Sequence, residues 1–315
     1  MNSRADLGAQ TTTDEVLDGI QLDGRHFMIT GATSGLGEET ARALAAHGAA
    51  VTMLGRNRAK LDAARVRVEK RVPTADLRIW EVDLAELASI RAFAETYQEG
   101  GDPIDVLINN AGVMASPESA TADGFELQFG TNHLGHFLLT NLLLPTILVG
   151  KEPRVVNLSS AAHGISDVDL DDPGFEQPDY DPWVAYGRSK TANVLFTREL
   201  ARRLDGRALA LAVHPGVIRT ELARHIPEES LDGMFEQFRD RMKTVEAGAA
   251  TQTWAATAAE LVSHSGSYLS DCQLGVLGAD TTGIGVREYA YDADNARRLW
   301  ELSEQLVGES FAVGG

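Results

Sequence analysis

The chain has 315 residues, of which 28 are basic and 46 acidic, so its net charge is −18; 43% of the residues are hydrophobic. This composition is typical of a globular protein and excludes a disordered or fibrous chain. The negative charge also predicts that the protein binds neither nucleic acid nor an anionic membrane surface.

The first 23 residues are predicted to form a polar N-terminal extension. They lack the basic flank and apolar core of a signal peptide, and no later stretch has the length and apolarity of a membrane span. A single cysteine, Cys272, excludes an internal disulfide, and we expect it to pack inertly. Together these features predict a cytoplasmic protein.

From residue 24 to 308, short apolar runs alternate with helical patterns. We expect strands at 27–29, 51–54, 77–80, 104–108, 155–158 and 208–213. We expect helices at 40–47, 59–70, 87–97, 125–144 and 184–204. This alternation predicts an α/β fold, a doubly wound (Rossmann-type) parallel sheet with helices on both faces, in a single domain.

Two segments depart from this alternation, and residues 309–315 are expected to form a C-terminal tail. Residues 161–183 are predicted to be an acidic insertion, since 166–183 contain six aspartates and three prolines. Residues 219–243 mix apolar and charged side chains like an amphipathic helix. They follow the sixth strand, at the sheet edge where doubly wound folds bind ligands, so we predict a substrate lid. A fixed surface helix is the alternative.

A glycine-rich turn, residues 30–37, joins the first expected strand to the first helix. Gly31, Gly35 and Gly37 are spaced G-x-x-x-G-x-G. Glycines allow the backbone to approach a pyrophosphate, and free N–H groups at a helix start attract its charge. An ordinary glycine-rich loop is the alternative, but the position at the first strand-to-helix junction favours a dinucleotide site.

The end of the second strand indicates which dinucleotide is bound. A carboxylate there would bind the adenosine ribose and repel a 2′-phosphate. The sequence instead has Arg56, whose planar guanidinium suits a phosphate. NADP(H) is therefore favoured over NAD(H), unless Arg56 and Arg58 simply flank a solvated helix start.

Tyr186 and Lys190 stand four residues apart at the start of a predicted helix, so their side chains share one face. A free tyrosine has a pKa of about 10, and a nearby cation would favour its phenolate. Such a group could exchange a proton with a carbonyl oxygen. The pair alone is a weak signal, because many solvated helix faces carry it.

Five motifs occur in a characteristic order. They are the glycine turn, Asn109 to Gly112, Ser159-Ser160, Tyr186 with Lys190, and Pro215-Gly216. This order resembles the short-chain dehydrogenase/reductase family, and the resemblance runs from about Leu22 to Val307. The segments NHLGHF (132–137), SKTAN (189–193) and VHPG (213–216) are similar to its retinol-dehydrogenase-like branch.

The resemblance implies a catalytic tetrad. Tyr186 would be the acid/base, and Lys190 would lower its pKa and hold the nicotinamide ribose. Ser160, chosen over Ser159 because the second serine is the usual family position, would bind the substrate oxygen. Asn132 would hold a water that joins Lys190 to solvent.

The turn, the second strand and the resemblance together imply a set of cofactor-binding residues. In this set Asp83 would contact the adenine, and the segment from Pro215 would close over the nicotinamide. The predicted set is Gly31, Thr33, Ser34, Gly35, Leu36, Gly37, Arg56, Asp83, Leu84, Asn110, Ala111, Gly112, Tyr186, Lys190, Pro215, Gly216, Ile218 and Thr220.

No metal is expected. His133 and His136 have no third ligand cluster, and hydride transfer from a nicotinamide needs no metal. His214 is expected to be structural, and the Trp and Phe residues to lie in the core.

We therefore expect an NADP(H)-dependent oxidoreductase that interconverts a moderately large, apolar alcohol and a carbonyl. An NADP(H)-binding redox sensor or scaffold is the alternative, which the complete tetrad disfavours. A sugar-nucleotide epimerase is disfavoured by the glycine spacing and the Pro215-Gly216 loop. The resemblance also implies a homodimer or homotetramer.

Overall fold

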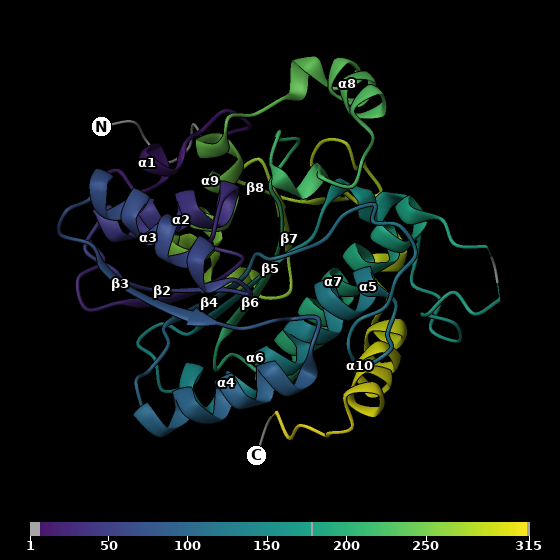
Figure 1. Ribbon diagram of the computed structural model, residues 1–315, viewed down its shortest axis with the longest axis horizontal. Helices are drawn as coiled ribbons and strands as arrows, with labels where there is room; N and C mark the ends of the chain where they lie inside the picture. The colour runs from purple at the N-terminus through teal and green to yellow at the C-terminus, as the bar shows by residue number, and fades with distance from the viewer. Residues whose placement is uncertain (1–6, 178, 314–315) are drawn as a thin grey trace.

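A computed structural model of the chain, which describes residues 7–177 and 179–313, is organised around one large sheet (Figure 1). Its strands lie in the order β3-β2-β1-β4-β5-β6-β7-β8. Strands β1 to β7 pair in parallel, and β8 is antiparallel to β7. The strands are β1 (His26–Thr30), β2 (Ala50–Gly55), β3 (Asp76–Glu81), β4 (Val106–Asn109), β5 (Arg154–Leu158), β6 (Leu209–His214), β7 (Tyr268–Ser270) and β8 (Gln273–Leu274), with a separate parallel pair β9 (Val276–Leu277) and β10 (Gly285–Val286).

Helices cover both faces of the sheet, which confirms the doubly wound fold (Figure 1). One core cluster joins the sheet to α4, α6, α7 and α10, and another joins it to α1, α2, α3 and α9. The helix α8 lies apart from both layers. The helices are α1 (Thr13–Val16), α2 (Gly35–Ala46), α3 (Arg58–Arg71), α4 (Leu87–Gly100), α5 (Leu127–Phe129), α6 (Gly135–Ile147), α7 (Pro182–Leu204), α8 (Glu228–Gln237), α9 (Val245–Thr257) and α10 (Ala293–Val307).

The central strands β4, β5 and β6 are buried along their whole length. Parallel strands that are covered on both faces consist of nearly continuous apolar residues, and the three strands could be predicted from such runs in the sequence. The strand order reverses between β1 and β4, which lie side by side. In such sheets ligands bind at this point, outside the carboxyl ends of the strands.

The helix expected at 125–144 is interrupted. It consists of α5, a π-helical segment Gly130–Leu134, and α6, which continues to Ile147. Apolar positions continue with helical spacing through all three pieces, so the sequence pattern does not reveal the wider turn. Short π segments inside α-helices occur frequently at functional sites, and this one contains Asn132.

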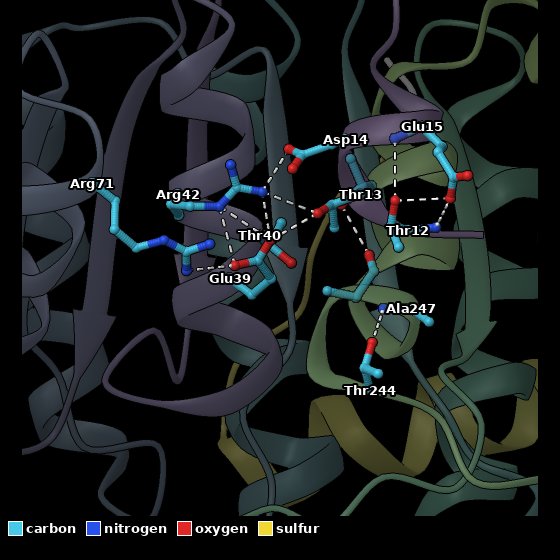
Figure 2. Close-up of polar contacts among 12 residues, drawn as sticks. Thr12, Thr13, Asp14, Glu15, Glu39, Thr40, Arg42, Arg71, Thr244 and Ala247 are labelled. Carbon is cyan, nitrogen blue, oxygen red and sulfur yellow. Dashed lines mark hydrogen bonds and ion pairs between the residues drawn. The ribbon is translucent and has the colours of Figure 1, made fainter. Parts of the chain in front are cut away.

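The described part of the N-terminal segment packs onto the domain, unlike the polar extension expected for residues 1–23. Arg42 of α2 donates to the Asp14 carboxylate at 2.7 Å and to the Thr13 hydroxyl at 3.2 Å (Figure 2). It also binds Glu39, which accepts from Arg71 of α3 at 3.1 Å. Hydrogen bonds and ion pairs around the buried Glu39 and Arg42 therefore link α1, α2 and α3.

The C-terminal tail also contacts the domain as far as it is described. Glu309 pairs with Arg91 of α4, whose guanidinium also donates to the Val307 carbonyl at 2.7 Å. Val313 is buried. Residues 1–6, 178 and 314–315, which belong to the predicted extension, insertion and tail, lie outside the described residues.

Candidate active site

A cavity of about 800 Å³ opens at the carboxyl edge of the sheet. Every predicted cofactor-binding residue lines it, and so do Ser160, Tyr186 and Lys190. Asn132 is the one predicted catalytic residue that does not, since it is fully buried behind the wall. The structure therefore brings together segments that are up to 252 residues apart, such as Thr30 and Thr282.

The glycine turn forms a close-fitting cradle. Gly31 has φ +67°, and a Cβ there would lie 2.8 Å from Ala111 Cα. A Cβ at Gly37 would lie 2.5 Å from the Gly31 carbonyl oxygen. The Asn110 side chain donates to the Thr30 carbonyl at 2.8 Å and holds the turn beside β4. With α2 beginning at the turn, this backbone surface fits a dinucleotide pyrophosphate.

Arg56 and Arg58, at the end of β2, have different surroundings. Arg58 pairs with Asp62 on the surface of α3 at 3.1 Å. Arg56 lines the cavity and has no ion-pair partner among residues 7–177 and 179–313. Arg56 therefore lies at the cavity, whereas Arg58 lies on the surface of α3, and the role of Arg56 toward the cofactor stays a prediction.

Tyr186 and Lys190 project from α7 into the cavity wall. The Lys190 ammonium lies 5.5 Å from the centre of the Tyr186 ring and donates to the Leu158 carbonyl at 3.1 Å. Ser160 begins a short 3-10 helix, and its hydroxyl accepts from the Ala162 N–H at 3.1 Å. Ser159 is buried and donates to the Lys190 carbonyl at 2.8 Å, so its position supports the choice of Ser160.

Burial, rather than the neighbouring cation, dominates the ionisation of these groups. It raises the pKa of Tyr186 to about 12, and a hydrogen bond with the Ser160 hydroxyl opposes that rise. Burial also lowers the pKa of Lys190 to about 8. In the protein alone, burial therefore sets the direction of both shifts, and the role of Lys190 in lowering the phenol pKa stays a prediction.

Asn132 shapes the wall behind Lys190. Its side chain accepts from the Val113 N–H at 2.8 Å and donates to the Val113 carbonyl and the Ser189 hydroxyl at 2.9 Å each. A Cβ on Gly112 would lie 3.2 Å from Asn132 Oδ1 and 3.6 Å from Lys190 Nζ. Asn132 thus fixes the segment beside the ammonium, and its water-holding role stays a prediction.

A hydrogen-bonded chain leads from Asn132 into the sheet. The backbone carbonyl of Asn132 lies 2.9 Å from His136 Nδ1, and His136 Nε2 lies 2.9 Å from the Thr30 hydroxyl. The Thr30 oxygen accepts from the Ala111 N–H at 2.9 Å. The fully buried His136 therefore joins the π segment to the glycine turn and to the loop after β4.

His214 has the structural role that the sequence predicted. Its Nδ1 accepts from the Ala161 N–H at 3.1 Å and from the Gly216 N–H at 3.4 Å, so it joins the ends of β5 and β6. Burial lowers its pKa to about 3, which keeps the ring neutral. In the described part of the chain, no group of three or more His, Cys, Asp or Glu side chains is arranged to hold a metal.

Comparison with known proteins adds to this geometry. The short chain dehydrogenase family model matches residues 25–231. The chain belongs to the short-chain dehydrogenase/reductase family. It is 43% identical to human retinol dehydrogenase 12 over 92% of this chain and 88% of that protein, and 40% identical to human retinol dehydrogenase 13 over 91% and 86%. It is therefore a member of the retinol-dehydrogenase-like branch, as the sequence motifs indicated.

Solved structures agree with this assignment. A crystal structure of an uncharacterized protein from Mycobacterium paratuberculosis covers 98% of both chains, with 38% identity and a TM-score of 0.73. A Pseudomonas aeruginosa structure described as a RhlG/NADP active-site complex covers 79% of this chain and 95% of its own, with 25% identity and a TM-score of 0.64.

This short-chain dehydrogenase is thus an oxidoreductase that binds NAD(P)(H) and acts on an alcohol or carbonyl group of a small molecule. Among its described helices, none combines the length and the apolarity needed to cross a membrane.

Several wall residues of this short-chain dehydrogenase were not predicted individually as site residues, although three of them belong to the predicted insertion or lid. Met114, Trp183, Phe235 and Phe238 line the cavity, so the expectation that the aromatic residues lie in the core is wrong for three of them. Trp183 packs edge-on against Tyr186, with ring centroids 6.3 Å apart. The sequence did contain a signal for Trp183, because Trp183 and Tyr186 are three residues apart and therefore share one helix face. Cys272 is buried, and burial raises its pKa to about 11, so its position agrees with the expected packing role.

Proposed function

We propose that this protein is an NADP(H)-dependent oxidoreductase that interconverts a bulky apolar alcohol and its ketone or aldehyde, with Tyr186 as the acid/base. One observation carries the proposal. Ser160, Tyr186 and Lys190 line the same cavity as the glycine cradle and Arg56. A reacting group placed beside the phenol therefore lies in the same space as the dinucleotide.

The bound nicotinamide supplies or accepts the hydride. In the reduction direction, the Ser160 hydroxyl and the Tyr186 phenol donate hydrogen bonds to the substrate carbonyl oxygen. A phenol with a pKa of about 12 is protonated at neutral pH, so it can pass its proton to that oxygen as the alcohol forms. The ammonium of Lys190 stabilises the phenolate that is left, and proton uptake from solvent restores the phenol.

The cavity wall supports a bulky apolar substrate. Met114, Trp183 and Phe235 form apolar parts of this wall. Charged lining residues other than Lys190 follow β2 and β3 or belong to the segment after Thr220, so they serve the adenosine end. The relatives named retinol dehydrogenases are named for an apolar alcohol, which favours the same class.

The NADP(H) preference rests on Arg56 and on the absence of a carboxylate at the end of β2. The neighbour described as an NADP complex is in agreement with it. A cytoplasmic location and a homodimer or homotetramer remain predictions of the sequence.

Turnover tests the proposal. NADPH oxidation is followed with a panel of apolar ketones and aldehydes, using wild type, Tyr186→Phe and Tyr180→Phe as the matched control. The Tyr180 phenol bonds Gln128 and Glu126 instead of facing the cavity. We expect Tyr186→Phe to lose at least about a thousandfold in kcat/KM with unchanged NADPH affinity, because only the proton transfer is lost.

Three outcomes would count against the proposal. Retention of more than a tenth of the activity by Tyr186→Phe would refute its role as acid/base. An equal loss in Tyr180→Phe would mean that the effect is structural. A wild-type protein that binds NADPH but reduces none of the panel would favour the redox sensor or scaffold.

A further inference from the structure

The first turn of the predicted lid lies over the adenosine end of the cavity, not over the catalytic tyrosine. This turn is a 3-10 helix, Glu221–Ala223, that begins at Thr220. A Cβ on Gly35 would lie 3.4 Å from Thr220 Cγ2. Ser34 at the start of α2 donates to the Glu221 carboxylate at 3.5 Å, and the Lys60 ammonium of α3 lies 4.0 Å from it. The turn is thus held against the glycine cradle and α3.

This placement brings Arg224 to the lining of the cavity that also contains Arg56. The hydrogen bond of Arg224 goes to the Glu221 carbonyl in its own turn, at 3.3 Å. Within the described residues, neither guanidinium has a carboxylate within ion-pair distance. Two arginines from segments 168 positions apart therefore face one cavity without an anionic partner.

The other arginines nearby do have such partners. Arg58 pairs with Asp62 at 3.1 Å, and Arg67 pairs with Glu38 at 2.6 Å. This contrast separates a cavity-facing pair from the basic surface of α3.

The two cations also act on one another. Burial first, and then the charge of Arg56, lower the pKa of Arg224, while the Glu221 carboxylate opposes both effects. Burial, Arg224 and Arg56 lower the pKa of the neighbouring His225 in the same way. An anion between two such like charges stabilises both of them, and guanidinium groups bind phosphate in a bidentate manner.

We propose that Arg224 is the second arm of the 2′-phosphate site, so that the cofactor's phosphate holds the first turn of the lid closed. The inference rests on the proposed NADP(H) dependence. Arg56 comes from the sheet and Arg224 from the lid, so a phosphate bound by both joins the two parts. The same lid then carries Phe235 and Phe238 to the substrate side of the cavity. The phosphate thereby couples the identity of the cofactor to closure of the substrate site.

The test compares 2′,5′-ADP with 5′-AMP, two probes that differ only in the 2′-phosphate. Calorimetry gives the Kd of each for wild type, Arg224→Ala, Arg56→Ala and the control Arg219→Ala. Arg219 belongs to the same lid but pairs with Asp232 at 3.4 Å. We expect Arg224→Ala to weaken 2′,5′-ADP by about tenfold, the loss of one charge-assisted contact, and to leave 5′-AMP unchanged. Arg219→Ala should change neither.

Hydrogen exchange gives a second readout. In wild type, 2′,5′-ADP should protect residues 219–227 and 5′-AMP should not; in Arg224→Ala this difference should disappear. If wild type binds both probes equally, the proposed NADP(H) dependence fails. If only Arg56→Ala loses the preference for 2′,5′-ADP, the role of Arg224 is refuted while NADP(H) dependence stands. Equal protection by both probes in wild type would refute phosphate-dependent closure.

Discussion

Arg42→Met tests whether the buried ionic contacts of Figure 2 stabilise the domain. The Glu39 side chain is 3% exposed and accepts from Arg42 at 2.5 Å, from the Thr13 hydroxyl at 2.7 Å and from Arg71 at 3.1 Å. Without Arg42, the buried carboxylate keeps only the half-exposed Arg71 as a charged partner. Removing one member of a buried pair costs roughly 3–5 kcal/mol, and because Arg71 remains we expect about 3 kcal/mol.

The double variant Glu39→Met with Arg42→Met separates this effect from loss of packing. It removes both charges, so it should be more stable than Arg42→Met alone, although it lacks more of the native contacts. Urea unfolding followed by circular dichroism measures each free energy. Arg67→Met is the control, because its exposed pair with Glu38 should contribute less than about 1 kcal/mol.

Two results would refute this reasoning. If the double variant is at least as unstable as Arg42→Met, the single variant leaves no uncompensated charge. If Arg42→Met costs no more than Arg67→Met, the contacts around Glu39 behave like an ordinary surface pair.

Four further predictions concern the site. Since burial raises the pKa of Tyr186 to about 12, wild type and Tyr186→Phe should show the same tyrosinate absorbance at pH 9 without cofactor; an excess in wild type would contradict this. The pKa of Lys190 is about 8 in the folded protein and 10.5 ordinarily, so its contribution to stability is present above pH 10.5 and is lost as the pH falls through 8. Lys190→Met should therefore gain stability relative to wild type between pH 10 and 7 in urea unfolding, and a constant difference would argue against it. Arg56→Ala should weaken NADPH binding by about 1–3 kcal/mol in calorimetry and barely affect NADH, and equal losses would exclude 2′-phosphate recognition. Residues 219–243 should exchange amide hydrogens more slowly with NADP(H) and an inhibitor than without them, and unchanged protection would leave a fixed surface helix.

The features that the sequence predicted are the local ones. The glycine turn, the buried strands and the Tyr186–Lys190 spacing each appear within a few consecutive residues, and parallel topology then brings the strand ends to one edge. The positions of Ser160 and Arg56 could be inferred because each lies within two residues of the end of a strand.

Features that depend on contacts between distant segments could not be predicted. Arg224 lines the same cavity as Arg56 only because a short turn folds back over the cradle, and no pattern in the sequence indicates that path. The pKa of Tyr186 depends on how completely the surrounding wall excludes water, which helical spacing does not show. The N-terminal contacts were not predicted, because polar residues such as Thr13 and Asp14 are usually exposed to solvent. In the structure, the buried Arg42 binds both of them.

Three buried neutral histidines make the protein sensitive to acid. Burial lowers the pKa of His133 to about 3, of His136 to about 4 and of His214 to about 3. A histidine in the unfolded chain has a pKa of about 6.5. Below that pH, the unfolded chain binds protons on these three rings, whereas the folded protein does not. Each ring then reduces the free energy of unfolding by about 1.4 kcal/mol for every pH unit, until the pH reaches its folded pKa. The same imidazoles that join β5 to β6 and the π segment to the glycine turn therefore set a lower pH limit for the intact site.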